Sequence, residues 1–424
     1  MASHVHGASR RSRGSGTKAD CVSGWSEQRA GIDPGCRRRR TAGSLTGMAD
    51  PVLQWAKRNQ PRVIRLIREL VEIESPSDAP EAVERCMDWL AEHLRGLGAV
   101  RREQGSLLCS FRLKGRREGS GTVLALGHAD TVWPLGTLRT MKFRRAEGRL
   151  WGPGVLDMKA GLVFFINAMR ALRELDVPVA HDVVLLVTPD EETGSRKSRA
   201  LIESVAKQCK AVLVLEPGTG LEGKAKTARK GIGDYTLTVR GVAAHAGVDF
   251  EKGASAVLEL ARQLEVIAGF TSQASGVTVN PGVISGGTRS NVIAAEARAH
   301  IDIRAPRLQD AAILEKKFRR LKSFDKRCTL ELTGGLNRPP MERSKGGAAL
   351  FQLARQQAAE LGVDLEESAT GGGSDGNFTA ALGVATLDGI GAVGEGAHAA
   401  HESILVDRIA DRVALLAKLT SAIL

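Results

Sequence analysis

Residues 122–130 read TVLALGHAD. A short apolar run leads here into His128 and Asp130, two polar residues with a single alanine between them. An unbroken apolar run of this length is typical of a strand that is covered on both faces, as strands of parallel sheets are. The stretch therefore predicts a central strand of an α/β sheet, with a histidine at its carboxyl end.

Two further stretches repeat this arrangement. Residues 183–188 (VVLLVT) precede the acidic run from Asp190 to Glu192, and residues 211–215 (AVLVL) precede Glu216. Functional groups of open α/β sheets collect at the carboxyl ends of parallel strands. We therefore expect the polar groups that follow the three strands to converge, however far apart they lie in the sequence.

The rest of the chain divides by pattern. Residues 48–222 alternate helix and strand, which favours a mostly parallel sheet with flanking helices. Residues 223–335 change to strand, helix, two strands, helix and strand, the order of a ferredoxin-like α+β fold. Residues 336–424 return to helical and Gly-rich segments. We predict a catalytic α/β domain built from residues 48–222 and 336–424, with a smaller domain inserted between them.

The net charge of +12 is unevenly distributed. Residues 1–47 hold nine Lys or Arg against three acids, which is half of the excess, and they show no apolar periodicity. Such a segment cannot bury a core, so we predict a disordered leader and a true start at Met48. Directly after it, Asp50 and Pro51 supply the N-cap and first-turn proline of a helix.

The charge alone does not indicate a nucleic-acid partner, because no basic stripe interleaved with aromatic residues is present in the sequence. The leader lacks the apolar region of a secretory signal, and no stretch is long enough to span a membrane. The six cysteines form no CxxC pair, which favours reduced thiols in a cytoplasmic protein. Any metal would be held by His and carboxylates.

The remaining polar groups complete a metal-binding pattern. Asp157 follows the Gly-rich turn WGPGVLD, where a carboxylate on a loop suits a bridging ligand, and the tail GIGAVGEGAHAAHE adds His398 and His401. Nitrogen and oxygen ligands without cysteine suit catalytic zinc, and two such ions about 3.5–4 Å apart can share a carboxylate and a water. Each residue alone is better explained as a structural or solvated group. The whole set is not.

Two neighbouring residues have more specific expected roles. Asp130 lies on the same strand face as His128, so its carboxylate can accept the second imidazole N–H and fix the tautomer. Glu191 and Glu192 must point in different directions, so that one can bind metal while the other faces the substrate as general base.

The motifs GHADTV, GPGVLDMKAG, TPDEETGS, LEPG, GVAAHAG, SNVI, DIR and TGGGSDGN, in this order, resemble a family of zinc-dependent hydrolases. The family includes glutamate carboxypeptidase, acetylornithine deacetylase, succinyl-diaminopimelate desuccinylase and the aminoacylases. The resemblance runs from about Met48 to Leu424 and is closest to the glutamate carboxypeptidase branch.

The resemblance implies two Zn²⁺ ions, with Co²⁺ or Mn²⁺ as substitutes. Asp157 matches the bridging carboxylate. His128 and Glu216 complete one zinc site, and Glu192 and His398 complete the other. Glu191 matches the general base, and Asp130 matches the residue that orients His128.

In the inserted segment, His245 matches a histidine that reaches the active site of a dimer partner and polarises the scissile carbonyl. Asn291 and Arg304 match residues that grip the substrate's carboxylate, which a guanidinium fork binds in a bidentate way. The resemblance thus implies a homodimer through the inserted domain.

The last metal ligand requires a choice between His398 and His401. Alignment of Glu402 with the glutamate that ends the family's tail motif favours His398.

The resulting hypothesis is a di-zinc hydrolase that cleaves an amide bond next to a free carboxylate in a small molecule or dipeptide, as a glutamate carboxypeptidase does. An N-acyl amino acid deacylase is the alternative, and a noncatalytic binding relative is a remote one.

Overall fold

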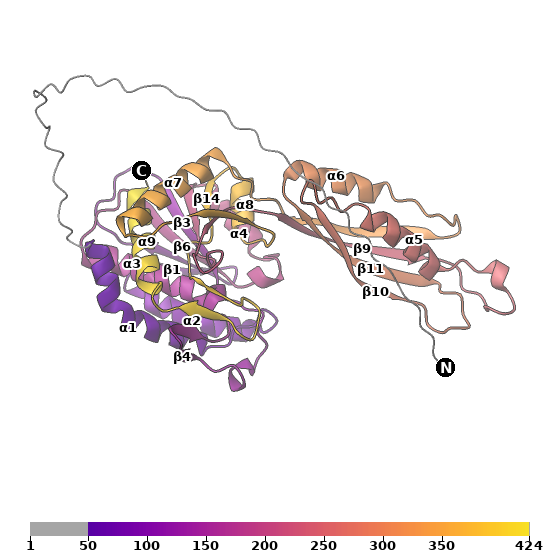
Figure 1. Ribbon diagram of the computed structural model, residues 1–424, viewed down its shortest axis with the longest axis horizontal. Helices are drawn as coiled ribbons and strands as arrows, with labels where there is room; N and C mark the ends of the chain where they lie inside the picture. The colour runs from indigo at the N-terminus through magenta and orange to yellow at the C-terminus, as the bar shows by residue number, and fades with distance from the viewer. Residues whose placement is uncertain (1–49, 424) are drawn as a thin grey trace, which may run out of the picture. The chain divides into compact units, whose positions relative to one another are not determined.

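The computed structural model describes residues 50–423, and the predictions of a disordered leader at residues 1–47 and of a start at Met48 lie outside this range. The main sheet has six strands in the order β1-β2-β6-β3-β7-β14 (Figure 1). Their bounds are β1 Gly98–Glu103, β2 Ser106–Phe111, β3 Thr122–His128, β6 Asp182–Thr188, β7 Cys209–Val214 and β14 Ala385–Leu387. Strands β6, β3, β7 and β14 are parallel, whereas β1 and β2 add an antiparallel edge. The predicted α/β class with a mostly parallel sheet is confirmed.

Helices cover both faces of this sheet. In β3, Val123 and Ala125 belong to one apolar core, whereas Leu124 and Leu126 belong to the other. The first core includes side chains of α1 (Pro51–Val71), α2 (Pro80–Arg95), α3 (Ala160–Glu174), α7 (Lys345–Glu360) and α9 (Ile409–Ala422). The second includes α4 (Arg199–Ala206) and α8 (Gly376–Ala381). Because successive residues of a strand point to opposite faces, burial on both sides makes the run apolar at every position.

The first helix begins where the sequence predicts. The Asp50 carboxylate accepts hydrogen bonds from the backbone N–H groups of Val52 (2.9 Å) and Leu53 (3.1 Å), and Pro51 occupies the first helical position. The four cysteines in the described range are free thiols. No helix within residues 50–423 combines the length and apolarity needed to cross a membrane.

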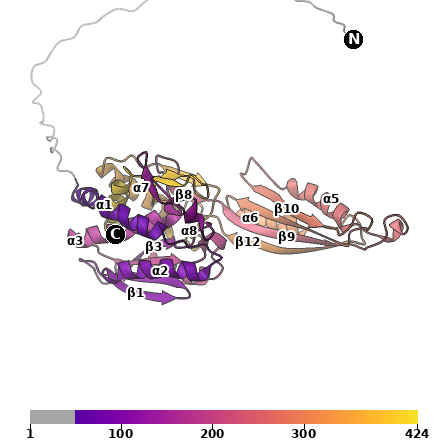
Figure 2. The same cartoon turned by 90° about the horizontal axis from the view of Figure 1, so that it is seen from below.

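A second sheet is antiparallel, with the order β10-β11-β9-β12. Its strands are β9 (Gly231–Arg240), β10 (Thr278–Gly286), β11 (Glu296–Ala305) and β12 (Thr329–Arg338). Helices α5 (Ala256–Ala268) and α6 (Leu308–Arg319) pack along it (Figure 2), and Tyr235 of β9 stacks on Phe318 of α6 with ring centroids 4.2 Å apart. The chain order is β9-α5-β10-β11-α6-β12, as the sequence predicts. The division into domains at residues 223 and 335 stays a prediction.

Two smaller sheets complete the described structure. Strand β13 (Glu367–Thr370) pairs with β8 (Ala225–Arg229), and the other sheet has the order β15-β16-β5-β4. Its strands are β4 (Arg144–Ala146), β5 (Arg149–Trp151), β15 (Gly394–Glu395) and β16 (Ser403–Leu405). Short helical turns occupy η1 Thr137–Arg139, η2 Val155–Lys159, η3 Glu191–Thr193 and η4 Phe250–Lys252. The sheet with β5 and β16 brings the segment that contains Asp157 close to the loop that contains His398.

Candidate active site

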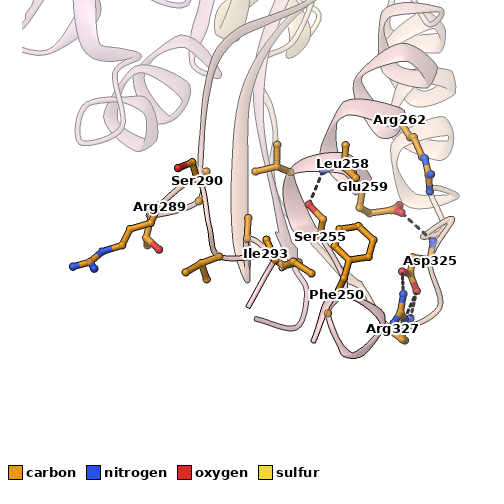
Figure 3. Close-up of a pocket in the computed structure, with 18 residues that line it drawn as sticks. Phe250, Ser255, Leu258, Glu259, Arg262, Arg289, Ser290, Ile293, Asp325 and Arg327 are labelled. Carbon is orange, nitrogen blue, oxygen red and sulfur yellow. Dashed lines mark hydrogen bonds and ion pairs between the residues drawn. The ribbon is translucent and has the colours of Figure 1, made fainter. Parts of the chain in front are cut away.

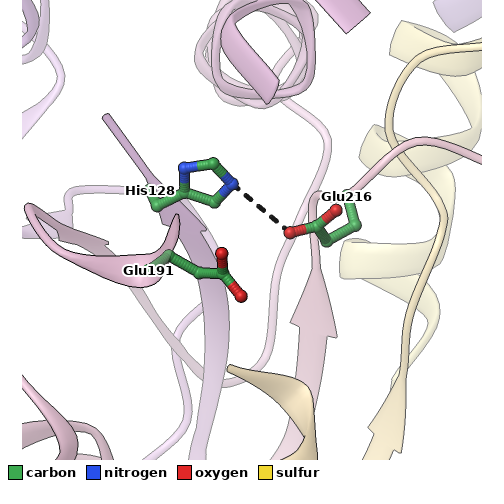
Figure 4. Close-up of side chains that lie close together, drawn as sticks. All are labelled: His128, Glu191 and Glu216. Atoms are coloured by element: carbon green, nitrogen blue, oxygen red, sulfur yellow. Dashed lines mark ion pairs between the residues drawn. The ribbon is translucent and has the colours of Figure 1, made fainter. Parts of the chain in front are cut away.

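Three ligand-type side chains follow neighbouring parallel strands. His128 ends β3, Glu191 begins the turn η3 after β6, and Glu216 comes two residues after β7. Since β6, β3 and β7 are adjacent and parallel, their carboxyl ends share one edge of the sheet. Figure 4 shows the three side chains directed toward one another, and one ligand-type atom from each lies within 4.8 Å of the other two.

The side chains form two groups with one shared member. The Nε2 atom of His128 lies 3.3 Å from Asp157 Oδ1 and 3.4 Å from Glu216 Oε1. The Nε2 atom of His398 lies 3.4 Å from Asp157 Oδ2 and 3.4 Å from Glu192 Oε2. Asp157 therefore presents one carboxylate oxygen to each group.

These distances fit metal ligation. Two ligands of a tetrahedral zinc with bonds of about 2.0–2.2 Å lie about 3.3–3.6 Å apart, the range observed within both groups. Two of these atoms, His128 Nε2 and Asp157 Oδ1, are buried without a hydrogen-bond partner in the described structure, and so is the second carboxylate oxygen of Glu192, Oε1. A buried polar atom without a partner costs about 1–3 kcal/mol, and a cation between the ligands would remove that cost. The imidazole and carboxylate donors suit zinc.

The two groups together form a cluster that has an excess of negative charge; its members are His128, Asp157, Glu192, Glu216 and His398. Hydrogen bonds to Asp157 and Glu192 raise the pKa of His398 to about 10. Burial opposes the charged form of His128, but Asp130, Asp157 and Glu216 outweigh it and hold the pKa of this imidazole well above its usual value. Two divalent cations would balance the same carboxylates.

Asp130 contacts both the histidine and the acidic turn. Its backbone carbonyl is 2.9 Å from His128 Nδ1, closer than its carboxylate oxygen Oδ1 at 3.4 Å. The carboxylate accepts the backbone N–H groups of Glu191 and Glu192, each at 3.1 Å, and the hydroxyl of Ser77 at 2.7 Å. Asp130 thus holds the acidic turn in place, and the nearer acceptor for the imidazole is its carbonyl instead of the predicted carboxylate.

Arg338, which the sequence reasoning missed, contacts Glu191. The guanidinium lies 3.0 Å from Glu191 Oε1 and 2.8 Å from Asp375 Oδ1, and both partners are largely buried. Burial raises the pKa of Glu191 well above its usual value, although the charges of Arg338 and His128 oppose the rise. The sequence signal for Asp375 is its place in the TGGGSDGN motif, which does not by itself indicate a role.

A second buried arginine lies behind Glu216. Arg229 forms a bidentate pair with Asp388, at 2.7 and 2.9 Å, and its Nη2 atom is 3.7 Å from Glu216 Oε2. Nearby, Lys226 is only 8% exposed, and burial lowers the pKa of its ammonium group. No sequence signal pointed to these residues, because a run such as KAKTARKG is usually a solvated turn.

The two tail histidines differ in position. His398 contacts Asp157 and Glu192 and has a backbone φ of 62°, which is uncommon for a residue other than glycine. Strained backbone of this kind collects at functional sites. His401 is exposed and forms no ion pair with these acids in the described structure. The geometry therefore brings His398, not His401, into the cluster.

The three residues predicted in the inserted segment are not brought to this cluster by any contact within residues 50–423. His245 and Asn291 are exposed and lie side by side, since the N–H of Ala246 donates to the carbonyl of Asn291 at 3.0 Å. The Arg304 fork is engaged by Asp302 on the same strand, through two hydrogen bonds of 2.9 Å. Their assigned roles stay predictions.

A large cavity lies elsewhere, beside the second sheet. It has a volume of about 700 Å³, and Phe250, Leu258, Ile293 and Arg289 are among the residues that line it (Figure 3). Phe250 and Leu258 are exposed. The cavity contains none of the cluster residues.

Sequence comparisons match this chain to known peptidases. The profile of Peptidase family M20/M25/M40 matches residues 124–422. Carboxypeptidase G2 of Pseudomonas sp. (strain RS-16) is 30% identical over 365 residues, which cover 84% of this chain and 88% of that protein.

Solved structures share the fold. The aminopeptidase PepT of Bacillus cereus ATCC 10987 superposes with a TM-score of 0.73 at 23% identity, covering 86% of this chain and 99% of that one. The M20 family metallo-carboxypeptidase Sso-CP2 of Sulfolobus solfataricus gives a TM-score of 0.65 at 16% identity, covering 85% and 99%. The family resemblance read from the motifs is confirmed. The chain belongs to Peptidase family M20/M25/M40 and is a metallopeptidase-type hydrolase.

Proposed function

We propose that this chain is a di-zinc hydrolase that cleaves an amide bond next to a free carboxylate, as a glutamate carboxypeptidase-like exopeptidase. The observation that carries the proposal is the position of Asp157, with one oxygen 3.3 Å from His128 Nε2 and the other 3.4 Å from His398 Nε2. A carboxylate between two sets of nitrogen and oxygen ligands suits a pair of ions. The similarity to a protein named carboxypeptidase G2 supports the substrate class.

In this proposal, one zinc is held by His128, Asp157 and Glu216, and the other by Asp157, Glu192 and His398. Zinc at these positions would supply Lewis acidity toward the amide carbonyl and make a water between the ions more acidic.

Glu191 carries the proton. Arg338 binds Oε1 of Glu191 at 3.0 Å, so we assign the proton transfer to Oε2. The carboxylate takes a proton from the attacking water and gives it to the leaving amine, while the water oxygen bonds to the acyl carbon and the C–N bond breaks. Burial raises the pKa of Glu191, which makes this carboxylate a stronger proton acceptor than an exposed glutamate.

Substrate recognition falls to residues outside the cluster. Asn291 and Arg304 would grip the free carboxylate, for which Arg304 must exchange its pair with Asp302 for the substrate. His245 would meet the carbonyl oxygen at the site of a second copy of the chain. Its exposure supports such a role, since the imidazole is accessible to another molecule.

The test is hydrolysis by the zinc-loaded protein of a panel in which the acyl group and the amino acid vary independently. We expect kcat/KM to depend mainly on the amino-acid side and to be highest for C-terminal glutamate. Strict dependence on the acyl group would favour the deacylase alternative. A protein that binds two zinc ions yet cleaves no member of the panel would overturn the proposal.

A further inference from the structure

We propose that Glu402 is a positioning residue that fixes the shared carboxylate Asp157 between the two ligand groups. The inference deepens the proposed metal site and rests on it. It concerns how the ligands are held, and Glu402 itself is not assigned as a ligand.

The Glu402 carboxylate is fully buried and accepts four N–H groups. Its Oε1 atom accepts the backbone N–H of Leu156 at 2.8 Å and of Asp157 at 3.1 Å. Its Oε2 atom accepts the backbone N–H of Gly154 at 2.8 Å and the indole N–H of Trp133 at 2.7 Å. Because all four partners are donors, only an ionised carboxylate satisfies them all.

These four contacts join three ligand-bearing segments. Trp133 follows the His128 strand end by five residues, the 154–157 turn carries Asp157, and Glu402 itself comes four residues after His398. Glu402 therefore belongs to the segment that contains His398, and its side chain is hydrogen-bonded to the segments that contain His128 and Asp157. These three segments supply ligands to both groups.

Backbone pairing holds these segments together but does not by itself orient the turn that contains Asp157. Strand β16 already pairs with β5 through Ser403 and Trp151, and the N–H of Gly152 donates to the Glu402 carbonyl at 3.4 Å. This pairing holds the two segments together without the side chain. The carboxylate adds the orientation of the three N–H groups at Gly154, Leu156 and Asp157, and so the direction in which the Asp157 side chain leaves the turn.

Glu402→Gln separates positioning from folding. The amide NH₂ replaces one acceptor oxygen, so it faces either the Leu156 and Asp157 donors or the Gly154 and Trp133 donors. In both cases a pair of N–H groups loses its acceptor and the turn must shift. Loss of a residue that orients metal ligands typically lowers metal affinity by about 10–100-fold, and we expect that range here.

The matched control is Glu174→Gln. Glu174, on helix α3, makes the same kind of contact, because its Oε2 atom accepts the indole N–H of Trp55 at 2.7 Å. Zinc affinity is measured by competition with a chromophoric chelator. The ligand field is measured from the visible absorption of the Co²⁺-loaded protein, and thermal unfolding is followed on the metal-free protein.

We expect Glu402→Gln to weaken zinc binding and change the Co²⁺ spectrum, while Glu174→Gln leaves both at wild-type values. A metal-free melting temperature near that of the wild type would assign the effect to positioning. Wild-type affinity and an unchanged spectrum in Glu402→Gln would overturn the inference, and so would a variant that only melts earlier. If the wild type itself binds no zinc, the proposed function fails instead.

Trp133→Phe covers the case in which Glu402→Gln does not fold. It removes one donor and leaves the carboxylate intact, so a smaller loss of affinity with a similar change of the Co²⁺ spectrum is expected. An unchanged affinity and spectrum in this variant would also count against the role of Glu402.

Discussion

Two adjacent glutamates lie at the turn after β6 and have different surroundings. Glu192 Oε2 is 3.4 Å from His398, whereas Glu191 Oε1 is 3.0 Å from Arg338. Neighbouring residues in an irregular turn can point in different directions, so a single short segment can supply both a metal ligand and a proton carrier.

The first prediction uses this contrast. Glu191→Gln keeps the side-chain volume and the metal ligands but removes the proton acceptor, so zinc content should stay at the wild-type value while kcat falls by at least about 100-fold. Glu192→Gln should instead lower the zinc content. The measurements are metal analysis after dialysis and steady-state kinetics, and turnover near the wild-type rate in Glu191→Gln would exclude its role as the base.

The second prediction concerns the tail histidines. His398→Ala removes the imidazole that contacts Asp157 and Glu192, so the variant should retain one zinc per chain instead of two. His401→Ala is the matched control, since this exposed imidazole lies only three residues away and should be dispensable. Full zinc content in the His398 variant would remove this residue from the metal site.

At the scale of elements, the packing of α3 against the end of β7 determines where two ligand segments meet. Gly161, in the first turn of α3, faces the carbonyl oxygen of Leu215, where a side chain of any size would collide with backbone. Asp157 lies just before this helix and Glu216 follows Leu215 directly. The close approach that only glycine permits therefore sets the spacing of the cluster.

The third prediction follows from this contact. Gly161→Ala should destabilise the protein by about 1–3 kcal/mol, because the helix must move away from the strand end, and should also weaken zinc binding. Gly96→Ala is the control, because no atom beyond its two chain neighbours lies within 4 Å of the position of an added Cβ there. Denaturant unfolding of the metal-free proteins measures the first effect. Equal stability of the two variants would contradict the argument.

Elements with a strong apolar pattern could be predicted from the sequence. The runs at 122–127 and 183–188 lie within β3 and β6, because burial on both faces leaves an uninterrupted signal. Short strands such as β15 and β16 could not be predicted, since two or three residues carry no periodicity. The sheet that brings the His398 loop to the Asp157 turn therefore could not be predicted from the sequence.

The candidate ligands were found for a different reason. They are chemically distinctive residues at strand ends beside glycines, and family motifs fixed their order. The supporting contacts were missed, because the pair of Arg338 with Asp375 spans 37 residues and depends on tertiary packing alone. Sequence patterns report what an element buries, whereas a buried ion pair depends on which elements meet.

At the scale of the whole molecule, the second sheet ends in an exposed edge. Strand β10 has no partner on its outer side within the described residues, and its side chains Val283 and Ile284 are 58% and 64% exposed. An apolar unpaired edge is a site for pairing with another chain. The edge supports the proposal of a homodimer through residues 223–335.

The fourth prediction tests this proposal. Ile284→Asp places a charge on the edge and should shift the protein from dimer to monomer in light scattering coupled to size-exclusion chromatography. Ile313→Asp is the matched control, since Ile313 is 53% exposed and lies on helix α6, which packs against the same sheet. A wild-type protein that is monomeric at micromolar concentration would contradict the proposal, and an equal effect in both variants would locate the interface elsewhere.

A cytoplasmic location stays a prediction from the cysteines.

The spread of the cluster along the chain affects when it can form during synthesis. Asp157 and His398 lie within contact distance of each other in the folded protein, yet about 240 residues separate them in the sequence. The intervening residues include the entire second sheet. At about 5–20 residues per second, a ribosome needs roughly 10–50 s to make that intervening chain. For this interval the nascent protein contains the Asp157 carboxylate but not His398. The group around His398 can therefore be completed only after residue 398 has been synthesised, and under the proposed function its zinc ion is acquired at that stage or afterwards.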